Sequence, residues 1–272
     1  MNIGINTNNE SGKNDIKILN NIKKSGFKNV MLSFKSKSVE KTLKAINKLK
    51  LNISYFHISN QYANDLWATG YAVEKYIKSV IDQLELCGKY NIPIAIMHAT
   101  TGSPSDLALA PNKQGLKNFK RILAVAKKNN VKIAIENIDC YGIDNLHYLL
   151  DNIKDKSVGF CYDVGHHHLY NPKVDMLEKY KDRLLAIHLH DNLMDWKVGH
   201  DYTRDLHLLP FDGKIDLEKV CRKLKSISYK GIVMLEVHKT AYADTQLYTN
   251  IAEMDFLNEA YKRAEKLASM IK

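Results

Sequence analysis

The sequence contains little glycine, proline and cysteine, with 13, 5 and 4 residues respectively among 272. The cysteines form no C-x-x-C pair and lie far apart, at Cys87, Cys140, Cys161 and Cys221. This spacing argues against a disulfide framework and a zinc knuckle, so we expect buried, reduced thiols. No G-x-G-x-x-G turn follows the first predicted strand, where the chain reads INTNNESGK. That absence argues against a doubly wound nucleotide-binding sheet.

Long apolar runs are also missing from the chain. None approaches the roughly 20 residues that a membrane-spanning helix needs. The N-terminal stretch MNIGINTNNESGKND has no basic segment followed by an apolar one, so no secretory signal is visible. We therefore expect a cytoplasmic protein with no membrane partner. The net charge is +10, but the lysines are spread along helix faces, which favours a solvated surface over a nucleic-acid-binding stripe.

Short apolar runs alternate with amphipathic segments along the whole chain. The runs are rich in β-branched residues and almost continuously apolar, as is typical of strands buried on both faces. We predict eight strands, at residues 3–6, 30–34, 53–57, 94–98, 132–136, 158–163, 184–188 and 232–237. Between them, apolar residues recur with the 3.6-residue period of a helix. Eight strand–helix units predict one domain over residues 1–272, a single (β/α)8 TIM barrel of the α/β class.

Histidine, aspartate or glutamate stands at the end of most predicted strands or in the loop that follows. These residues are His57, His98, Glu136, Asp163, His188, Asp205, His207 and Glu236. The carboxyl ends of the strands in a parallel barrel all point to one face. We therefore expect these side chains to converge on one pocket at the mouth of the barrel.

Four of these residues form the predicted metal site: Glu136, Asp163, His188 and Glu236. An ionised carboxylate at the end of an apolar strand carries a large desolvation cost unless a cation meets it. The donors are oxygen and nitrogen, with no thiolate, which suits a borderline or hard divalent ion. We expect Zn²⁺ or Mn²⁺ first, with Mg²⁺ and Co²⁺ as alternatives.

The remaining polar residues near the strand ends have more than one interpretation. Candidates for further metal ligands are His57, His98, His166, Asp205 and His207. Candidates for substrate contacts are His57, His98, His166, His190 and Trp67. His190 and Asp191 fit equally well as residues that orient His188 and as loop hydrogen bonders. The ring of Trp67 fits a wall against a sugar ring, core packing or a subunit contact.

Six stretches of the chain carry a resemblance to a known family. They read HISNQYANDLW, IAIEN, GFCYDVGHHH, IHLHDN, DLHLLPFDGKID and VMLEVH, from the third predicted strand to the eighth. With these motifs the chain resembles the xylose isomerase-like barrel superfamily. It is most similar to the bacterial sugar phosphate isomerases and epimerases, a group that includes inosose dehydratases and ketose 3-epimerases.

The resemblance implies a metal-dependent isomerase or epimerase whose partner is a small sugar, sugar phosphate or cyclitol. It implies one divalent ion on the four predicted ligands, with Glu136 and Glu236 as an acid/base pair on opposite faces of the substrate. One glutamate would remove a proton next to a carbonyl, giving an enediolate, and the other would return a proton. His166 would be a catalytic contact to substrate or metal.

Other functions stay open at this point. Ketose epimerases of this group usually carry an arginine beyond the metal-binding histidine, where this chain has Met194, so a metal-dependent dehydratase or lyase is an alternative. Type IV AP endonucleases of the same superfamily hold three zinc ions and act on abasic DNA. All their ligands have counterparts here, although their D-T-x-H-x-x-A-A-G signature reads DVGHHHLYN. A sugar-binding sensor without activity, and a homodimer, are also open.

Overall fold

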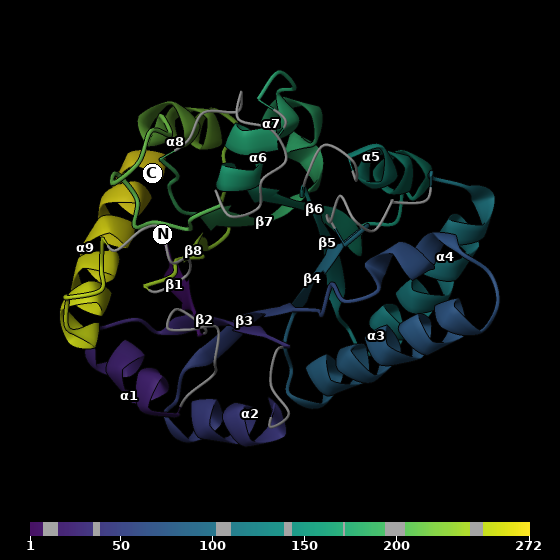
Figure 1. Cartoon of the computed structure of the whole chain (residues 1–272), viewed down its shortest axis with the longest axis horizontal. Helices are drawn as coiled ribbons and strands as arrows, with labels where there is room; N and C mark the ends of the chain where they lie inside the picture. Colours follow the sequence, from purple (N-terminus) through teal and green to yellow (C-terminus); the bar gives the residue numbers. More distant parts are fainter. Residues whose placement is uncertain are drawn as a thin grey trace.

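The computed structural model describes residues 1–7, 16–34, 39–101, 110–138, 143–170, 172–193, 205–239 and 247–272. Within them, parallel strands close into a barrel in the order β1 to β8, and helices surround it (Figure 1). Each strand pairs with the next one in the chain, and β1 also pairs with β8. The (β/α)8 TIM barrel expected from the sequence is confirmed.

The strands lie where the apolar runs predict them. Their bounds are β1 (Ile3–Asn6), β2 (Asn29–Ser33), β3 (Asn52–His57), β4 (Ile94–His98), β5 (Lys132–Glu136), β6 (Val158–Asp163), β7 (Leu184–Leu189) and β8 (Val233–Leu235). The last strand is shorter than predicted and ends one residue before Glu236. Glu236 therefore stands just past the strand, as a residue at the mouth of the barrel should.

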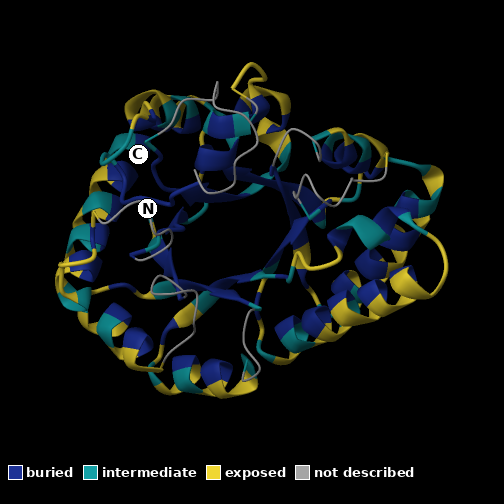
Figure 2. Ribbon diagram, in the orientation of Figure 1, coloured by how far each residue is buried: buried dark blue, intermediate teal, exposed yellow. Residues whose placement is uncertain are grey.

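The helices bury one face against the barrel and expose the other, as Figure 2 shows. In the helix at Lys113–Lys128, Phe119 and Ile122 are buried while Lys120 and Lys127 are exposed. The Asn112 side chain caps the N-terminus of this helix. The helices are α1 (Ile16–Lys24), α2 (Val39–Lys48), α3 (Tyr71–Lys89), α4 (Lys113–Lys128), α5 (Ile143–Asn152), α6 (Val164–Tyr170), α7 (Met176–Lys179), α8 (Leu217–Ser226) and α9 (Glu253–Ile271), with 3-10 helices η1 (Ala63–Trp67) and η2 (Lys181–Arg183). None of those described is long and apolar enough to cross a membrane.

The barrel interior is built in layers, because alternate residues of a strand point inward. One buried cluster inside the barrel takes a residue from each of seven strands: Met31, Tyr55, Ile96, Ala134, Cys161, Ala186 and Met234. Two residues further along each chain segment stand Ser33, His57, His98, Glu136, Asp163, His188 and Glu236. The period of two therefore places the predicted ligands that the strands carry in the layer above this apolar cluster.

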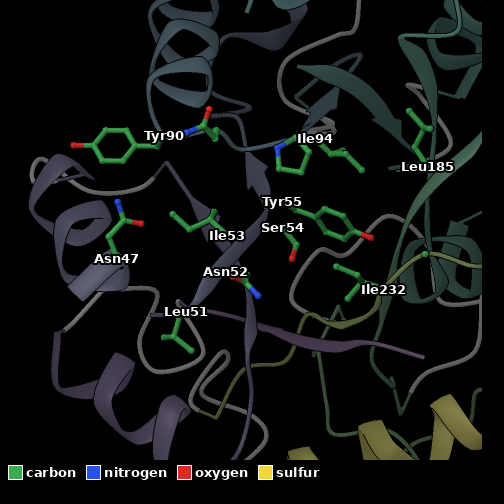
Figure 3. A pocket seen from close by; sticks show the side chains of 13 residues that line it. Asn47, Leu51, Asn52, Ile53, Ser54, Tyr55, Tyr90, Ile94, Leu185 and Ile232 are labelled. Carbon is green, nitrogen blue, oxygen red and sulfur yellow. The ribbon is translucent and has the colours of Figure 1, made fainter. Parts of the chain in front are cut away.

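A pocket lies at the N-terminal end of the barrel, opposite the predicted ligands (Figure 3). Its volume is about 430 Å³, and its walls come from the starts of β3, β4 and β7 and from the segment before β8. Asparagine, tyrosine and aliphatic side chains line it, among them Asn52, Tyr90 and Leu185. Among the described residues that line it, none is charged and none is a histidine.

Candidate metal centre

Four predicted ligands meet at the C-terminal end of the barrel and are called the quartet here: Glu136, Asp163, His188 and Glu236. One ligand atom of each lies within 4.8 Å of the others. Nδ1 of His188 lies 3.0 Å from Glu236 Oε2, 3.2 Å from Glu136 Oε1 and 3.7 Å from Asp163 Oδ2. Glu236 is 8% exposed and the other three are fully buried. Four successive strands, β5 to β8, thus bring one ligand each to one point.

The charges of the quartet fit a divalent cation. Burial alone would raise the pKa of Glu136, but His188 and His98 hold it well below its ordinary value. Burial alone would lower the pKa of His188, but Cys161, Glu136 and Glu236 raise it well above 6.5. The buried carboxylates therefore require positive charge between them, which a divalent ion supplies. Their oxygen donors and one imidazole suit zinc, manganese, cobalt or magnesium.

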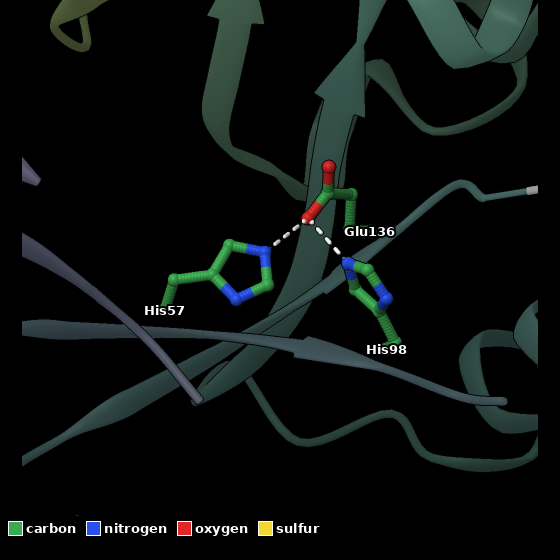
Figure 4. Close-up of side chains that lie close together, drawn as sticks. All are labelled: His57, His98 and Glu136. Atoms are coloured by element: carbon green, nitrogen blue, oxygen red, sulfur yellow. Dashed lines mark hydrogen bonds and ion pairs between the residues drawn. The ribbon is translucent and has the colours of Figure 1, made fainter. Parts of the chain in front are cut away.

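Glu136 also belongs to a second group, the strand triad of His57, His98 and Glu136. Figure 4 shows both imidazoles directed at the same carboxylate oxygen. Nε2 of His57 lies 3.1 Å from Glu136 Oε2, and Nε2 of His98 lies 3.0 Å from it. The other oxygen, Oε1, faces His188. Glu136 is therefore placed as a bridge, with one oxygen for each group.

The third group is the loop triad of His166, Asp205 and His207. Oδ2 of Asp205 lies 2.9 Å from His166 Nε2 and 3.0 Å from His207 Nε2. Burial alone would lower the pKa of His207, but Asp205 raises it to about 9. Nδ1 of His166 lies 2.9 Å from the Asn137 carbonyl oxygen, and Nδ1 of His207 lies 2.9 Å from the Glu236 carbonyl oxygen. These carbonyls leave Nε2 of each ring directed at Asp205.

All nine residues predicted as ligands or possible ligands are brought together in these three groups. The donors have the number and spacing to hold one ion at the quartet, or further ions at the two triads. Met194, which marks the departure from the ketose epimerases, lies outside the described residues.

Two predicted substrate contacts, Trp67 and His190, are buried and are not among the described residues that line the pocket at the mouth. Trp67 is 2% exposed and its indole N–H donates to the Ala99 carbonyl oxygen at 2.7 Å, so its ring packs in the core. His190 is fully buried, and its Nε2 lies 3.0 Å from Asp163 Oδ1. Its ring stacks on that of His207 with centroids 4.0 Å apart. His190 therefore contacts two predicted ligands, in the arrangement of a residue that orients them.

The mouth of the barrel holds a pocket of about 160 Å³. Its walls include His57, His98 and His166, the remaining predicted substrate contacts. They also include Ser59, Asn60 and His238, together with Ser33 and Phe34, which sequence reasoning missed. Ser33 could have been predicted from the sequence, because it lies two positions after Met31, an inward-facing residue of the same strand.

Cys161 was also missed as a neighbour of the site. Its sulfur lies within 4.8 Å of ligand atoms of Glu136 and His188. Burial raises the pKa of the Cys161 thiol to about 12. A coordinating cation would deprotonate this thiol, so Cys161 is a further candidate ligand together with Glu136 and His188.

Comparison with known proteins gives a family and a set of related folds. The family model described as Xylose isomerase-like TIM barrel matches residues 19–260. Uncharacterized protein y4fM of Sinorhizobium fredii is 29% identical over 160 residues, covering 57% of this chain and 47% of that protein. Uncharacterized protein MJ1311 of Methanocaldococcus jannaschii is 26% identical over 158 residues, covering 55% and 51%. The chain thus matches about half the length of these curated relatives.

Solved structures with the same fold include enzymes that act on sugars. A D-tagatose 3-epimerase-like protein matches with a TM-score of 0.75 and 18% identity, over 100% of this chain and 98% of that one. D-psicose 3-epimerase from Clostridium cellulolyticum H10 matches with a TM-score of 0.75 and 13% identity, over 100% of both chains. At these identities the likeness establishes the fold.

Proposed function

The chain belongs to the xylose isomerase-like TIM barrel family, and on that basis we propose that it is a divalent-metal-dependent isomerase or epimerase acting on a small sugar. The observation that carries the proposal is the quartet, which lies beside a pocket whose wall includes Glu136 and Glu236. Active sites of TIM barrels lie at this face, at the ends of the strands. The sugar epimerases among the structures of the same fold support this class of reaction.

The pocket favours a compact, uncharged substrate. Its volume of about 160 Å³ is below the range typical of drug-sized ligands. Among the described residues that line it, none is lysine or arginine. Recognition of phosphate usually uses such cations. We therefore expect a free sugar in preference to a sugar phosphate.

The two glutamates differ in their access to a substrate. Glu236 lines the pocket and is 8% exposed, so we assign it the removal of the proton next to the carbonyl. Glu136 is fully buried with both oxygens facing imidazoles, so we assign the return of a proton to Glu136 acting through His57, which contacts it and lines the pocket. A divalent ion on the quartet would supply a Lewis acid for the carbonyl oxygen. His98 and His166 then orient the substrate hydroxyls.

Hydrogen exchange with solvent tests the proposal. Manganese- or zinc-loaded protein is incubated in D₂O with D-tagatose, D-allulose, D-fructose and L-ribulose, and NMR follows deuterium at the carbons beside the carbonyl. We expect exchange into at least one ketose and a rate about 10²- to 10⁴-fold lower in Glu236→Gln, the usual range for a lost general base. The matched control is Glu74→Gln, an exposed residue paired with Arg121 on the outer helices, which should exchange as wild type. Absence of exchange with every ketose tested would falsify the proposal.

A second candidate is a phosphodiesterase acting on abasic DNA. The two triads favour it, because a single-ion isomerase needs only the quartet, whereas multi-metal sites are typical of phosphodiester hydrolysis. It requires three ions per chain and cleavage of a duplex with one abasic site. Elemental analysis giving about one ion for the loaded protein, with an intact duplex, would remove this candidate.

A further inference from the structure

The three groups of ligands are held in different ways. Every ligand of the quartet stands on a strand or one residue past it, whereas Asp205 and His207 of the loop triad lie on residues 205–216, called the strap here. The strap is described without helix or strand apart from an isolated bridge at Leu208. Some other interaction must therefore fix the two ligands it carries.

Asp191 holds the strap through its backbone. The residue is fully buried, and its Oδ1 accepts hydrogen bonds from the N–H of Asn192 at 2.8 Å and of Ile215 at 3.0 Å. Its Oδ2 accepts from the N–H of Phe211 at 3.0 Å. Its backbone pairs with Leu208 in both directions, at 3.0 and 2.8 Å. Backbone N–H groups thus satisfy both oxygens of a buried carboxylate that belongs to none of the three ligand groups.

Asn192 carries the connection from Asp191 to the ligand. Its side-chain N–H donates to Asp205 Oδ1 at 3.1 Å, opposite the oxygen that faces the two histidines. Its side-chain oxygen accepts from the N–H of Leu206, and its carbonyl accepts from that of Lys214. Asn192 is fully buried. Asn192 therefore orients Asp205, and Asn192 is itself held by the hydrogen bond from its backbone N–H to Asp191.

The strap passes so close to Asp191 that its path is fixed sterically. A Cβ atom on Gly213 would lie 2.3 Å from Asp191 Oδ1 and 2.4 Å from the Asn192 carbonyl oxygen. Any larger residue at Gly213 would force the strap away from both.

We propose that Asp191 is a positioning residue that assembles the loop triad, so that the affinity of this triad for a divalent ion depends on Asp191 while that of the quartet does not. The inference deepens the proposed metal centre and requires that the loop triad binds an ion. Replacing Asp191 with asparagine turns an acceptor into a donor facing a backbone N–H, which breaks part of the strap. Loss of such a supporting group typically lowers metal affinity about 10- to 100-fold.

The experiment measures zinc binding by the full chain. Wild type and Asp191→Asn are loaded with zinc, dialysed against a competing chelator and analysed for zinc per chain, while amide hydrogen exchange is followed at Phe211 and Ile215. We expect the variant to lose one class of zinc site, with about 10- to 100-fold weaker affinity, and faster exchange at both amides. The quartet zinc should keep its affinity. Asp216→Asn is the matched control, since this strap carboxylate caps α8 through the Lys219 N–H, and it should bind zinc as wild type.

The outcomes separate the inference from the proposed function. Wild-type zinc affinities in Asp191→Asn overturn it. A wild-type protein that binds a single zinc also overturns it and leaves the proposed isomerase standing, whereas absence of sugar exchange bears on the isomerase alone. If Asp191→Asn does not fold, Gly213→Ala is used instead, because its methyl group displaces the same contact. That variant is expected to lose the same zinc site, and wild-type affinities in it overturn the inference.

Discussion

The pockets at the two ends of the barrel differ in volume and in their lining, and the larger pocket has the less polar chemistry. The pocket at the N-terminal end has a volume of about 430 Å³, against about 160 Å³ at the mouth. In the part of the chain that the structure describes, no charged residue or histidine lines the larger pocket, whereas Glu136, Glu236 and five histidines line the smaller one. Both ends are reached by the same strands, separated by one apolar layer. Volume therefore says little about function here, and the titratable groups that face the pocket say more.

The two ends differ in the free energy needed to bury their polar and charged side chains. Uncharged side chains at the N-terminal end carry a much smaller penalty for losing water than ionised groups do, so that end needs no balancing charge. The mouth concentrates buried carboxylates and imidazoles, which are stable only when their charges are balanced. We therefore expect changes in metal or pH to act on the mouth and to leave the opposite end unaffected. The following predictions test that difference.

Removal of metal should have the largest effect on stability. A ligand that binds only the folded state adds about 4 kcal/mol when its free concentration is 1,000 times its dissociation constant. We expect the unfolding free energy, measured with urea, to fall by about this amount between zinc-loaded and EDTA-treated protein. His188→Leu, which removes the central imidazole of the quartet, should abolish most of that difference. Equal stability of loaded and EDTA-treated wild type would show that the mouth does not depend on a cation.

The metal-free protein should lose stability at alkaline pH. The pKa of His207 is raised from 6.5 to about 9, and those of His166 and His188 are also raised. A histidine with a raised pKa stabilises the folded state below 6.5, and this contribution disappears as the pH rises through the folded pKa. For His207 alone the loss is about 3 kcal/mol.

Urea unfolding of EDTA-treated protein below pH 6.5 and above pH 9 measures this loss. The zinc-loaded protein is the control, because bound metal replaces the protons and should flatten the alkaline decline. On the acid side both forms should weaken, since the pKa values of Glu136, Asp205 and Glu236 are held below their ordinary values and their contribution is lost as the pH falls. A metal-free protein that is equally stable on both sides of the interval would contradict the charge balance described for the mouth.

The sequence could place the four residues of the quartet together because the strand ends and the inward-facing positions of the strands both follow from the apolar pattern. Strand runs end at Glu136 and Asp163 as predicted, and every strand of a parallel barrel delivers its last inward residue to the same face. The positions of Trp67 and His190 were harder to predict. Trp67 follows β3 through a segment whose path depends on tertiary contacts, whereas His190 directly follows β7 and its surroundings come from residues distant in the sequence. Trp67 turns inward to the Ala99 carbonyl oxygen, and nothing in the local sequence distinguishes that from an outward ring.

Of the two roles that the sequence leaves open for Asp191, the structure shows the loop hydrogen bonder, but the sequence could not identify its partners. Its partners Phe211 and Ile215 lie 20 and 24 residues away, and the bonds involve backbone N–H groups that any residue could offer. Side-chain patterns report which residues face a core or a pocket. They do not report which backbone groups a buried carboxylate will meet.

The smallest effect is expected at the N-terminal end. Ile232 lines the larger pocket, and Ile232→Val should lower the unfolding free energy by about 1 kcal/mol through loss of one partly buried methylene. Zinc affinity and sugar exchange should match wild type, because the layer of Tyr55, Cys161 and Met234 separates this pocket from the ligands. Urea unfolding and zinc titration measure the two quantities on the same sample. A stability loss accompanied by weaker zinc binding would mean that the apolar layer transmits strain from one end of the barrel to the other, and the two ends could no longer be treated as independent.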